Sequence, residues 1–189
     1  MIAGHFGFAA IVKSRERTAP LWALMLATAW LDIVFIPLFI AHRETVQTVH
    51  AGYAGSIIHA NYTHSIVGML ALSAALGALF LPKLGRRVAL VVALVSASHW
   101  ALDLVVHRAD MPLLPGNLGN LPLLGLGLWN DPRVAACVEL FLVLAGAILY
   151  WRAATEVAAK ARTSGKLASL SAAMIAAFGV LVLFLDYTS

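Results

Sequence analysis

The stretch RVALVVALVSASHWALDLVV at residues 87–106 decides the fold, because it is long and apolar enough to cross a lipid bilayer as one helix. Over the whole chain, 61% of the residues are apolar and only 12% are charged. Soluble domains carry about 45–50% apolar and about 25% charged residues. A soluble globular protein is therefore excluded, and lipid is the solvent for most of this chain.

A crossing takes about 20 apolar residues, and this criterion predicts five membrane-spanning helices. They cover residues 20–41, 62–81, 87–106, 132–151 and 167–186. The apolar segment 2–12 is too short to cross, so we expect an interfacial or a re-entrant helix there. The predicted fold class is an all-α integral membrane protein. It forms a single transmembrane helical domain over residues 1–189, with five spans and this short N-terminal helix.

The basic residues predict the orientation of the chain. Ten of the thirteen Lys and Arg residues lie in three linkers that the five spans put on one side of the membrane. The positive-inside rule makes that side cytoplasmic. We therefore expect a multi-pass protein of the inner (cytoplasmic) membrane, with the basic segment 13–17 inside. The net charge of +4 is explained without a nucleic-acid partner, since no basic stripe with interleaved aromatic residues occurs.

Several ionisable side chains lie inside the predicted spans, where inserting a charge costs about 2.5–3.5 kcal/mol. They are Asp32, His64, His99, Asp103 and Glu139. Counted from the cytoplasmic helix ends at ~1.5 Å per residue, they fall at depths of about 18–27 Å, and His5 at about 12 Å if its helix is re-entrant. Each alone is explained by an interhelical hydrogen bond. Their common layer favours a shared metal or proton site.

The third predicted span carries the sharpest motif. His99 and Asp103 are four residues apart and lie on one helix face, and His107 and Asp110 continue that face outward if the helix extends. An imidazole and a carboxylate at this spacing can bind one cation together. The single cysteine, Cys137, excludes a zinc motif built on several thiolates. Nitrogen and oxygen ligands predict a divalent metal, zinc first, with manganese or iron as alternatives.

Three ordered motifs resemble those of a known family. They are Asn-Tyr-Thr-His-Ser at 61–65, Ser-His-Trp-Ala-Leu-Asp at 98–103 and His-Arg-Ala-Asp-Met-Pro-Leu-Leu-Pro-Gly at 107–116. The family is that of the small bacterial membrane-bound metal-dependent hydrolases, and the resemblance runs from His5 to about Trp151. It implies metal dependence more directly than it implies a substrate.

A more distant likeness is to the zinc-dependent phospholipase C and P1 nuclease group, whose ligand order is similar to that of His5, Asp32, His64, His99 and Asp103. It implies that these five side chains hold one or two divalent cations. The chain departs from that group because it lacks an N-terminal tryptophan and a second His-x-x-x-Asp/Glu pair. A third metal is therefore not expected.

The same resemblance implies roles for the remaining polar residues. Glu139 is a further ligand or a proton acceptor. His107, Arg108 and Asp110 stand at the outer mouth, where Arg108 suits a phosphate or carboxylate group of the substrate. Asp110 or His59 then donates a proton to the leaving group. The segment 111–129 is either a lid or a cap packed on the bundle.

We expect a membrane-embedded hydrolase of a lipid or lipid-linked (phospho)ester near the outer leaflet, using metal-activated water. The alternatives are a metal-ion or proton transporter or channel that uses the same cluster as its path, and a non-catalytic subunit. The inner halves of the spans, such as residues 21–29, 88–97 and 142–150, are nearly all apolar. This pattern favours a cavity that opens outward and disfavours a permeation path across the membrane. The expected partners are the bilayer and a lipid substrate, and the sequence leaves the oligomeric state open.

Overall fold

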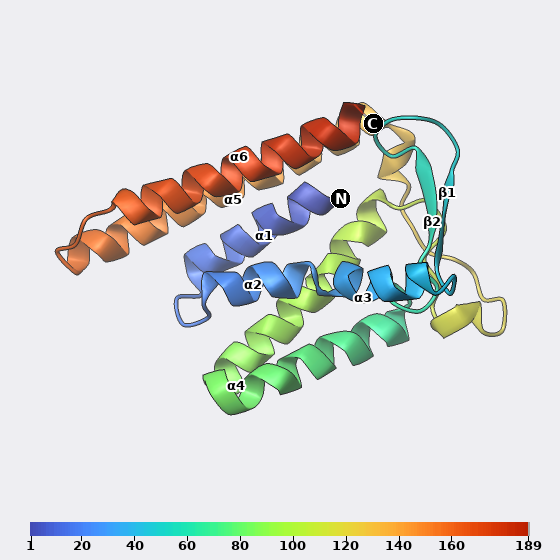
Figure 1. Ribbon diagram of the computed structural model, residues 1–189, viewed down its shortest axis with the longest axis horizontal. Coiled ribbons are helices and arrows are strands. Elements are labelled where there is room, and N and C mark those ends of the chain that lie inside the picture. Colours follow the sequence, from blue (N-terminus) through green and yellow to red (C-terminus); the bar gives the residue numbers. More distant parts are fainter. Residues whose placement is uncertain (189) are drawn as a thin grey trace.

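The computed structural model describes residues 1–188 and is mostly helical (Figure 1). Within these residues the elements are α1 (Ile2–Arg15), α2 (Leu21–Thr28), α3 (Trp30–Ile40), β1 (Thr45–Thr48), β2 (Ser56–His59), α4 (Ile66–Val106), the 3-10 turns η1 (Pro115–Asn117) and η2 (Leu128–Asn130), α5 (Pro132–Lys160) and α6 (Lys166–Thr188). Three helices, α4, α5 and α6, are long and apolar enough to cross a membrane, and the bent pair α2–α3 adds a fourth if it is one span. The predicted helical character and the presence of candidate membrane spans are confirmed, whereas the count of five spans is not supported.

The predicted span 20–41 is broken rather than straight. α2 and α3 meet at an angle of 43°, and Ala29 between them is the C-cap of one helix and the N-cap of the other. The break puts Asp32 in the first turn of α3, where the positive end of the helix dipole favours a carboxylate.

α4 consists of two arms, residues 66–84 and 86–106, that fold back on each other (Figure 1). Gly85 joins them with φ 77° and ψ 169°, a backbone conformation that glycine adopts without steric cost. Ser73 in the first arm donates a 2.9 Å hydrogen bond to Ser96 in the second. A Cβ at Gly77 would lie 2.9 Å from the Ala89 carbonyl oxygen, so the arms pack closely. The break predicted between residues 81 and 87 is present.

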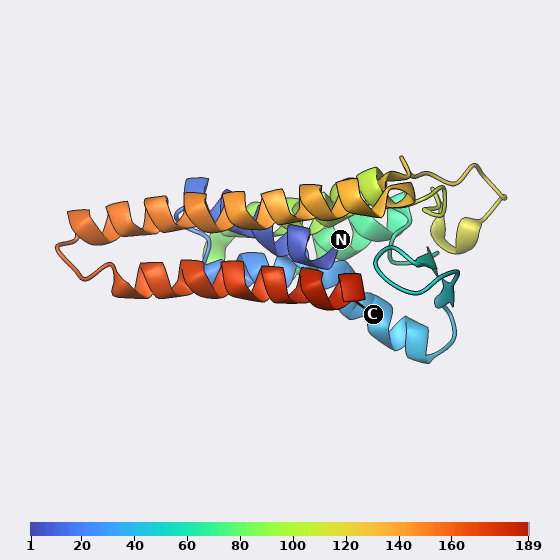
Figure 2. The same cartoon turned by 90° about the horizontal axis from the view of Figure 1, so that it is seen from above.

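α1 lies inside the bundle and contacts α2, α4, α5 and α6 (Figures 1 and 2). Its closest neighbour is α5. A Cβ at Gly7 would lie 2.4 Å from the Leu142 carbonyl oxygen, and one at Gly146 would lie 2.2 Å from the Gly7 carbonyl oxygen. Glycine at both positions therefore lets the two backbones touch, and this contact fixes the depth of His5 in the bundle.

One end of the bundle carries non-helical structure, and the sequence analysis did not predict its two strands. β1 and β2 form an antiparallel pair with Thr45 opposite His59. The segment 111–129 packs on the ends of α4, because the Ile66 amide donates to the Pro112 carbonyl and the Gly127 amide donates to the His107 carbonyl. Of the two alternatives for this segment, these bonds support a cap packed on the bundle.

Candidate metal centre

The five predicted ligands come together at the capped end of the bundle. His5 comes from α1, Asp32 from α3, and His99 and Asp103 from the second arm of α4. His64 lies in the turn just before α4, where Ser65 caps the helix by accepting a hydrogen bond from the Gly68 amide. All are buried except Asp32, whose side chain is 43% exposed. The structure thus brings these five side chains together from separate segments, whereas Glu139, predicted in the same layer, contacts Gly4 and Tyr53 instead.

Three of these side chains, Asp32, His64 and His99, have the spacing of ligands around one ion, and Asp103 lies beside them. Asp32 Oδ1, His64 Nε2 and His99 Nε2 lie 3.3, 3.5 and 3.6 Å apart. Asp103 Oδ2 lies 3.0 Å from His99 Nε2 and 3.5 Å from His64 Nε2. Ligands of a tetrahedral zinc ion, bound at about 2.0–2.2 Å, are about 3.3–3.6 Å apart. The group is therefore positioned to hold a divalent cation.

The backbone and a hydroxyl group fix which ring nitrogens face the site. His99 Nδ1 lies 2.6 Å from the Thr28 carbonyl oxygen, which only accepts, so this Nδ1 carries the proton. His64 Nδ1 lies 2.9 Å from Thr63 Oγ1, whose own hydrogen goes to the carboxylate of Glu44 at 3.0 and 3.1 Å. In the neutral rings both Nε2 atoms then present lone pairs to each other across 3.3 Å. A cation satisfies both lone pairs, whereas a hydrogen bond does not.

Sequence reasoning missed the residues that orient these rings. Glu44 looks like a solvated loop residue in the sequence, yet it is buried and accepts hydrogen bonds from the amides of Tyr62 and Thr63. Thr28 contributes twice, because its hydroxyl also donates to the His5 carbonyl oxygen at 3.0 Å. Of these three residues, only Thr63 could have been suspected from the sequence, because it is next to His64.

His5 packs directly on the group. Its ring stacks on His99 with centroids 3.8 Å apart, and its Nε2 lies 3.0 Å from Asp103 Oδ1. His5, His99 and Asp103 form a second set whose ligand atoms are close enough for an ion. The buried Nδ1 of His5 has no hydrogen-bond partner among the described residues. Asp103 therefore uses one oxygen toward His5 and the other toward His64 and His99.

His107 and Asp110 form a separate pair beside the group. His107 Nδ1 lies 2.9 Å from Asp110 Oδ1, and both side chains are buried. His107 Nε2 lies 3.9 Å from Asp103 Oδ2. The ring is held from its other side by Trp129, with centroids 4.4 Å apart. An imidazole fixed in this way presents Nε2 for proton transfer.

The structure places Glu139 outside the ligand groups. It is fully buried, and its two oxygens accept hydrogen bonds from the Gly4 amide at 2.9 Å and from the Tyr53 hydroxyl at 2.8 Å. Burial and the adjacent carboxylate raise the pKa of the Tyr53 phenol, which stays protonated and donates. Glu139 thus ties α5 to the residue preceding His5.

The guanidinium group of Arg108 is occupied by hydrogen bonds to other residues of this chain. Its guanidinium donates to the Ala54 and Ser56 carbonyl oxygens at 2.9 and 3.3 Å and to Asn130 Oδ1 at 3.1 Å. It holds the β1–β2 loop against the segment before α5. His59 lies in β2, paired with Thr45.

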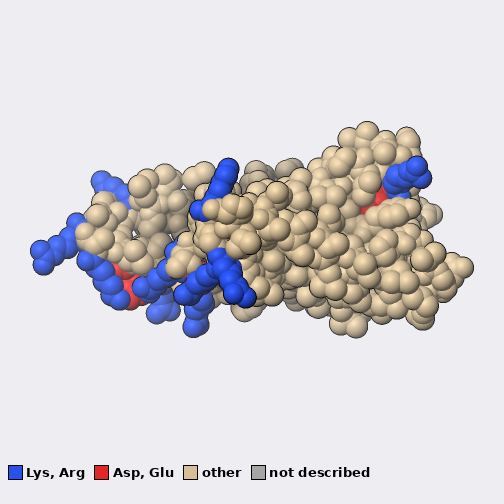
Figure 3. Space-filling view, turned by 90° about the horizontal axis from the view of Figure 1, so that it is seen from below, with Lys and Arg blue, Asp and Glu red and all other residues tan. Residues whose placement is uncertain are grey.

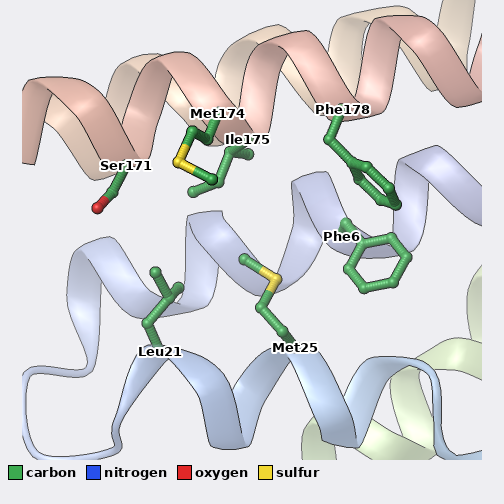
Figure 4. Close-up of a pocket in the computed structure, with 7 residues that line it drawn as sticks. All are labelled: Phe6, Leu21, Met25, Ser171, Met174, Ile175 and Phe178. Atoms are coloured by element: carbon green, nitrogen blue, oxygen red, sulfur yellow. The ribbon is translucent and has the colours of Figure 1, made fainter.

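A cavity of about 310 Å³ reaches the cluster. Its walls combine five polar side chains with seven apolar ones and consist of Met1, Ile2, His5, Asp32, Phe35, Ile36, Val46, Ile58, His64, Asp103, His107 and Trp129. A second cavity, of about 330 Å³, lies between α6 and the pair α1 and α2 (Figure 4). Its lining is Phe6, Leu21, Met25, Ser171, Met174, Ile175 and Phe178. No titratable side chain is among them, whereas the first cavity reaches the His/Asp cluster and is therefore the candidate reaction site.

Comparisons with protein-family models, curated proteins and solved structures find no match to this chain. The functional conclusion therefore depends on the chemistry of the site.

Proposed function

We propose that this chain is a membrane-embedded metal-dependent hydrolase, of the kind its motifs resemble, acting on a lipid or lipid-linked ester near the outer leaflet of the cytoplasmic membrane. The observation that carries the proposal is that His107, oriented by Asp110, lines the same cavity as a group of side chains positioned to hold a cation. A bound divalent cation, with zinc favoured by the nitrogen and oxygen ligands, would activate water and polarise the ester.

In this proposal each polar side chain of the cavity has a distinct task. One cation would be held by Asp32, His64, His99 and Asp103. His5 donates from Nε2 to Asp103 Oδ1 and so orients that carboxylate. His107 accepts a proton at Nε2 and returns it to the leaving group, while Asp110 holds the ring and stabilises its charged form. Glu139 and Arg108 act at a distance, by holding α1 and the cap.

The membrane arrangement that fits this function has five crossings. α2–α3 crosses once as a bent helix, the two arms of α4 cross separately, and α5 and α6 complete the set. Lys and Arg side chains gather toward one end of the molecule (Figure 3), where α1 joins α2, the two arms of α4 meet and α5 joins α6 (Figure 1). We assign this end to the cytoplasm by the positive-inside rule. α1 is then a re-entrant helix, and the cavity opens toward the outside.

A transporter is disfavoured by what lies on the cytoplasmic side of the cluster. A permeation path needs polar groups or water along its length. Between the cluster and the basic end, α1, α2 and α4 instead bury an apolar layer that includes Ala9, Leu24, Ala27, Leu76 and Val92. This layer supports a cavity that ends at the cluster.

Metal content is the first test of the proposal. Freshly purified protein should contain about one divalent transition metal ion per chain, and His99→Ala should lose it because His99 supplies a ligand nitrogen. His42→Ala is the matched control, since His42 is an exposed loop residue. Elemental analysis measures both. Metal-free wild-type protein would overturn the proposal.

Hydrolysis of a lipid ester distinguishes the proposed hydrolase from the transporter. Ester lipids in mixed micelles should be cleaved, a chelator should stop the reaction, and Zn²⁺ should restore it. His107→Ala should keep its metal while losing roughly 10²–10⁴-fold in kcat, the usual contribution of a positioned acid or base. Metal flux into liposomes without lipid turnover would instead favour the transporter.

A further inference from the structure

The basic end of the molecule contains a cavity that shares no residue with the candidate metal centre. It has a volume of about 340 Å³ and is lined by Lys13, Arg17, Tyr150, Ala153, Ala154 and Val157. We propose that this cavity binds the headgroup of an anionic phospholipid, with the phosphate beside the two cations and the start of the acyl chains against α5. The proposal does not depend on the hydrolase function.

The first step is the charge around the cavity. The three linkers at this end hold ten Lys and Arg residues but only two acidic ones, Glu16 and Glu156. Glu16 is paired with Arg87 at 2.9 Å. Glu156 is shared by Arg17 at 3.6 Å and Lys160 at 2.5 Å. Both carboxylates are therefore already paired, and the excess of cations at this end attracts a further anion.

The second step concerns the donors that the cavity offers. Lys13 Nζ donates to the carbonyl oxygens of Arg17 and Ala19 at 3.0 and 2.7 Å, which holds the ammonium group in place. An ammonium group has three donors, so one N–H remains for a ligand. The Arg17 side chain is 55% exposed, and its distance of 3.6 Å to Glu156 is longer than a hydrogen bond. Its guanidinium can therefore donate to a phosphate as well.

The third step is the opposite wall of the cavity. Tyr150, Ala153, Ala154 and Val157 are three or four residues apart and so lie on one face of α5. The two alanines leave space between α5 and the segment that follows α1. The Tyr150 hydroxyl makes no hydrogen bond within residues 1–188, which leaves it able to donate to a phosphate oxygen. The cavity thus joins a cationic wall to a mainly apolar one, as a phospholipid joins its phosphate to its acyl chains.

The position of the cavity along α5 favours a lipid over a soluble phosphate compound. α5 is long and apolar enough to cross a membrane, and its predicted apolar span ends at Trp151, directly beside the cavity residue Tyr150. Trp151 is 46% exposed, and exposed tryptophans at span ends are typical of the boundary between lipid and water. The cavity therefore lies at headgroup level. Basic pockets at the cytoplasmic ends of membrane helices bind anionic lipid headgroups, and the proposed orientation puts this one in the cytoplasmic leaflet.

Native mass spectrometry of the full-length protein in detergent tests the proposal. Dioleoyl phosphatidylglycerol should bind at a saturable site, and dioleoyl phosphatidylcholine, which has no net charge, should bind more weakly. Arg17→Gln should weaken phosphatidylglycerol binding about fivefold, the effect of one basic residue near an anionic lipid surface. Arg86→Gln is the matched control, because it removes an exposed arginine of the same end that does not line the cavity.

A second pair of variants separates the cavity from diffuse attraction to the basic surface. Ala154→Leu keeps every charge but fills part of the cavity, so it should also weaken phosphatidylglycerol binding. Ala159→Leu makes the same change at an exposed position of α5 outside the lining, and it should bind the lipid as the wild type does. Thermal unfolding without added lipid checks that all four variants are folded.

Weaker phosphatidylglycerol binding in both Arg17→Gln and Ala154→Leu, with unchanged binding in their controls, supports the proposal. Equal binding of the two lipids by the wild type overturns it. Equal losses in Arg17→Gln and Arg86→Gln, or wild-type binding in Ala154→Leu, would put the lipid outside the cavity. Displacement of the lipid by an equal concentration of inorganic phosphate would identify a soluble phosphate as the occupant. None of these measurements requires metal or turnover, so their failure would leave the hydrolase proposal standing.

Discussion

Three of the four histidines of the candidate site are oriented through Nδ1, the nitrogen that faces away from the cluster. His99 is held by a backbone carbonyl, His64 by the Thr63 hydroxyl and His107 by the Asp110 carboxylate. Each partner accepts from Nδ1–H and leaves Nε2 as the free nitrogen. Partners of this kind fix the tautomer and the ring direction of a metal ligand, and their loss usually lowers metal affinity by about 10–100-fold.

Thr63 provides a test of this at a single residue. Thr63→Val removes the hydroxyl between His64 and Glu44 while keeping the side-chain shape. We expect zinc affinity to fall about 10–100-fold, with Thr63→Ser close to wild type. A chelator competition titration measures the change. Unchanged affinity in Thr63→Val would mean that the ring direction is set by packing alone.

At the residue scale, the sequence identified the candidate ligands but not the residues that orient them. Asp32, His99 and Asp103 stand out because ionisable side chains are rare in apolar spans. The Thr28 carbonyl reaches His99 only because α2 ends there, and neither proline nor glycine marks that break in the sequence. In the sequence Glu44 is an ordinary acidic loop residue, and only the tertiary structure shows that it is buried. The contact between Thr28 and His99 and the burial of Glu44 both depend on packing between distant segments, which a local sequence pattern does not encode.

At the scale of elements, the contact between α1 and α5 sets the position of His5. Gly7 and Gly146 allow the two helix backbones to touch, and Glu139 of α5 accepts the Gly4 amide one residue before His5. α1 therefore carries its ligand-orienting histidine on a rigid support. A bulkier residue at the contact should move the histidine and lower stability together.

Gly7→Ala tests this coupling. The added methyl group would lie 2.4 Å from the Leu142 carbonyl oxygen, so the helices must separate. We expect a loss of about 1–3 kcal/mol in stability, typical of overpacking, and weaker zinc binding. Gly165→Ala is the control, because its nearest atom would be 3.5 Å away. Thermal unfolding in detergent and metal titration measure the two effects, and a variant with wild-type values in both would refute the coupling.

The elements themselves were predictable to different degrees. Long apolar segments predict helices because the bilayer requires internally satisfied backbones, and Pro82 and Gly85 predict the break within α4. The bend at Ala29 and the strands β1 and β2 were not predicted. The strands are only four residues long, too short for an alternating pattern to be recognised.

At the scale of the whole molecule, the two ends have opposite character. Lys and Arg side chains gather toward one end (Figure 3), and the other end carries the β-hairpin and the cap (Figure 1), beside the His/Asp cluster. Charge asymmetry of this kind sets topology during insertion, because Lys and Arg are retained on the cytoplasmic side. The orientation can therefore be tested without knowing the substrate.

Single cysteines placed at the two ends test the orientation in a Cys137→Ala background. Val49→Cys lies in the exposed β1–β2 loop, and Thr163→Cys lies in the exposed α5–α6 loop. A membrane-impermeant maleimide applied to spheroplasts should label the first variant at once and the second only after permeabilisation, because the positive-inside rule assigns the basic end to the cytoplasm. The opposite labelling order would turn the cavity toward the cytoplasm, and a lipid substrate would then have to come from the inner leaflet.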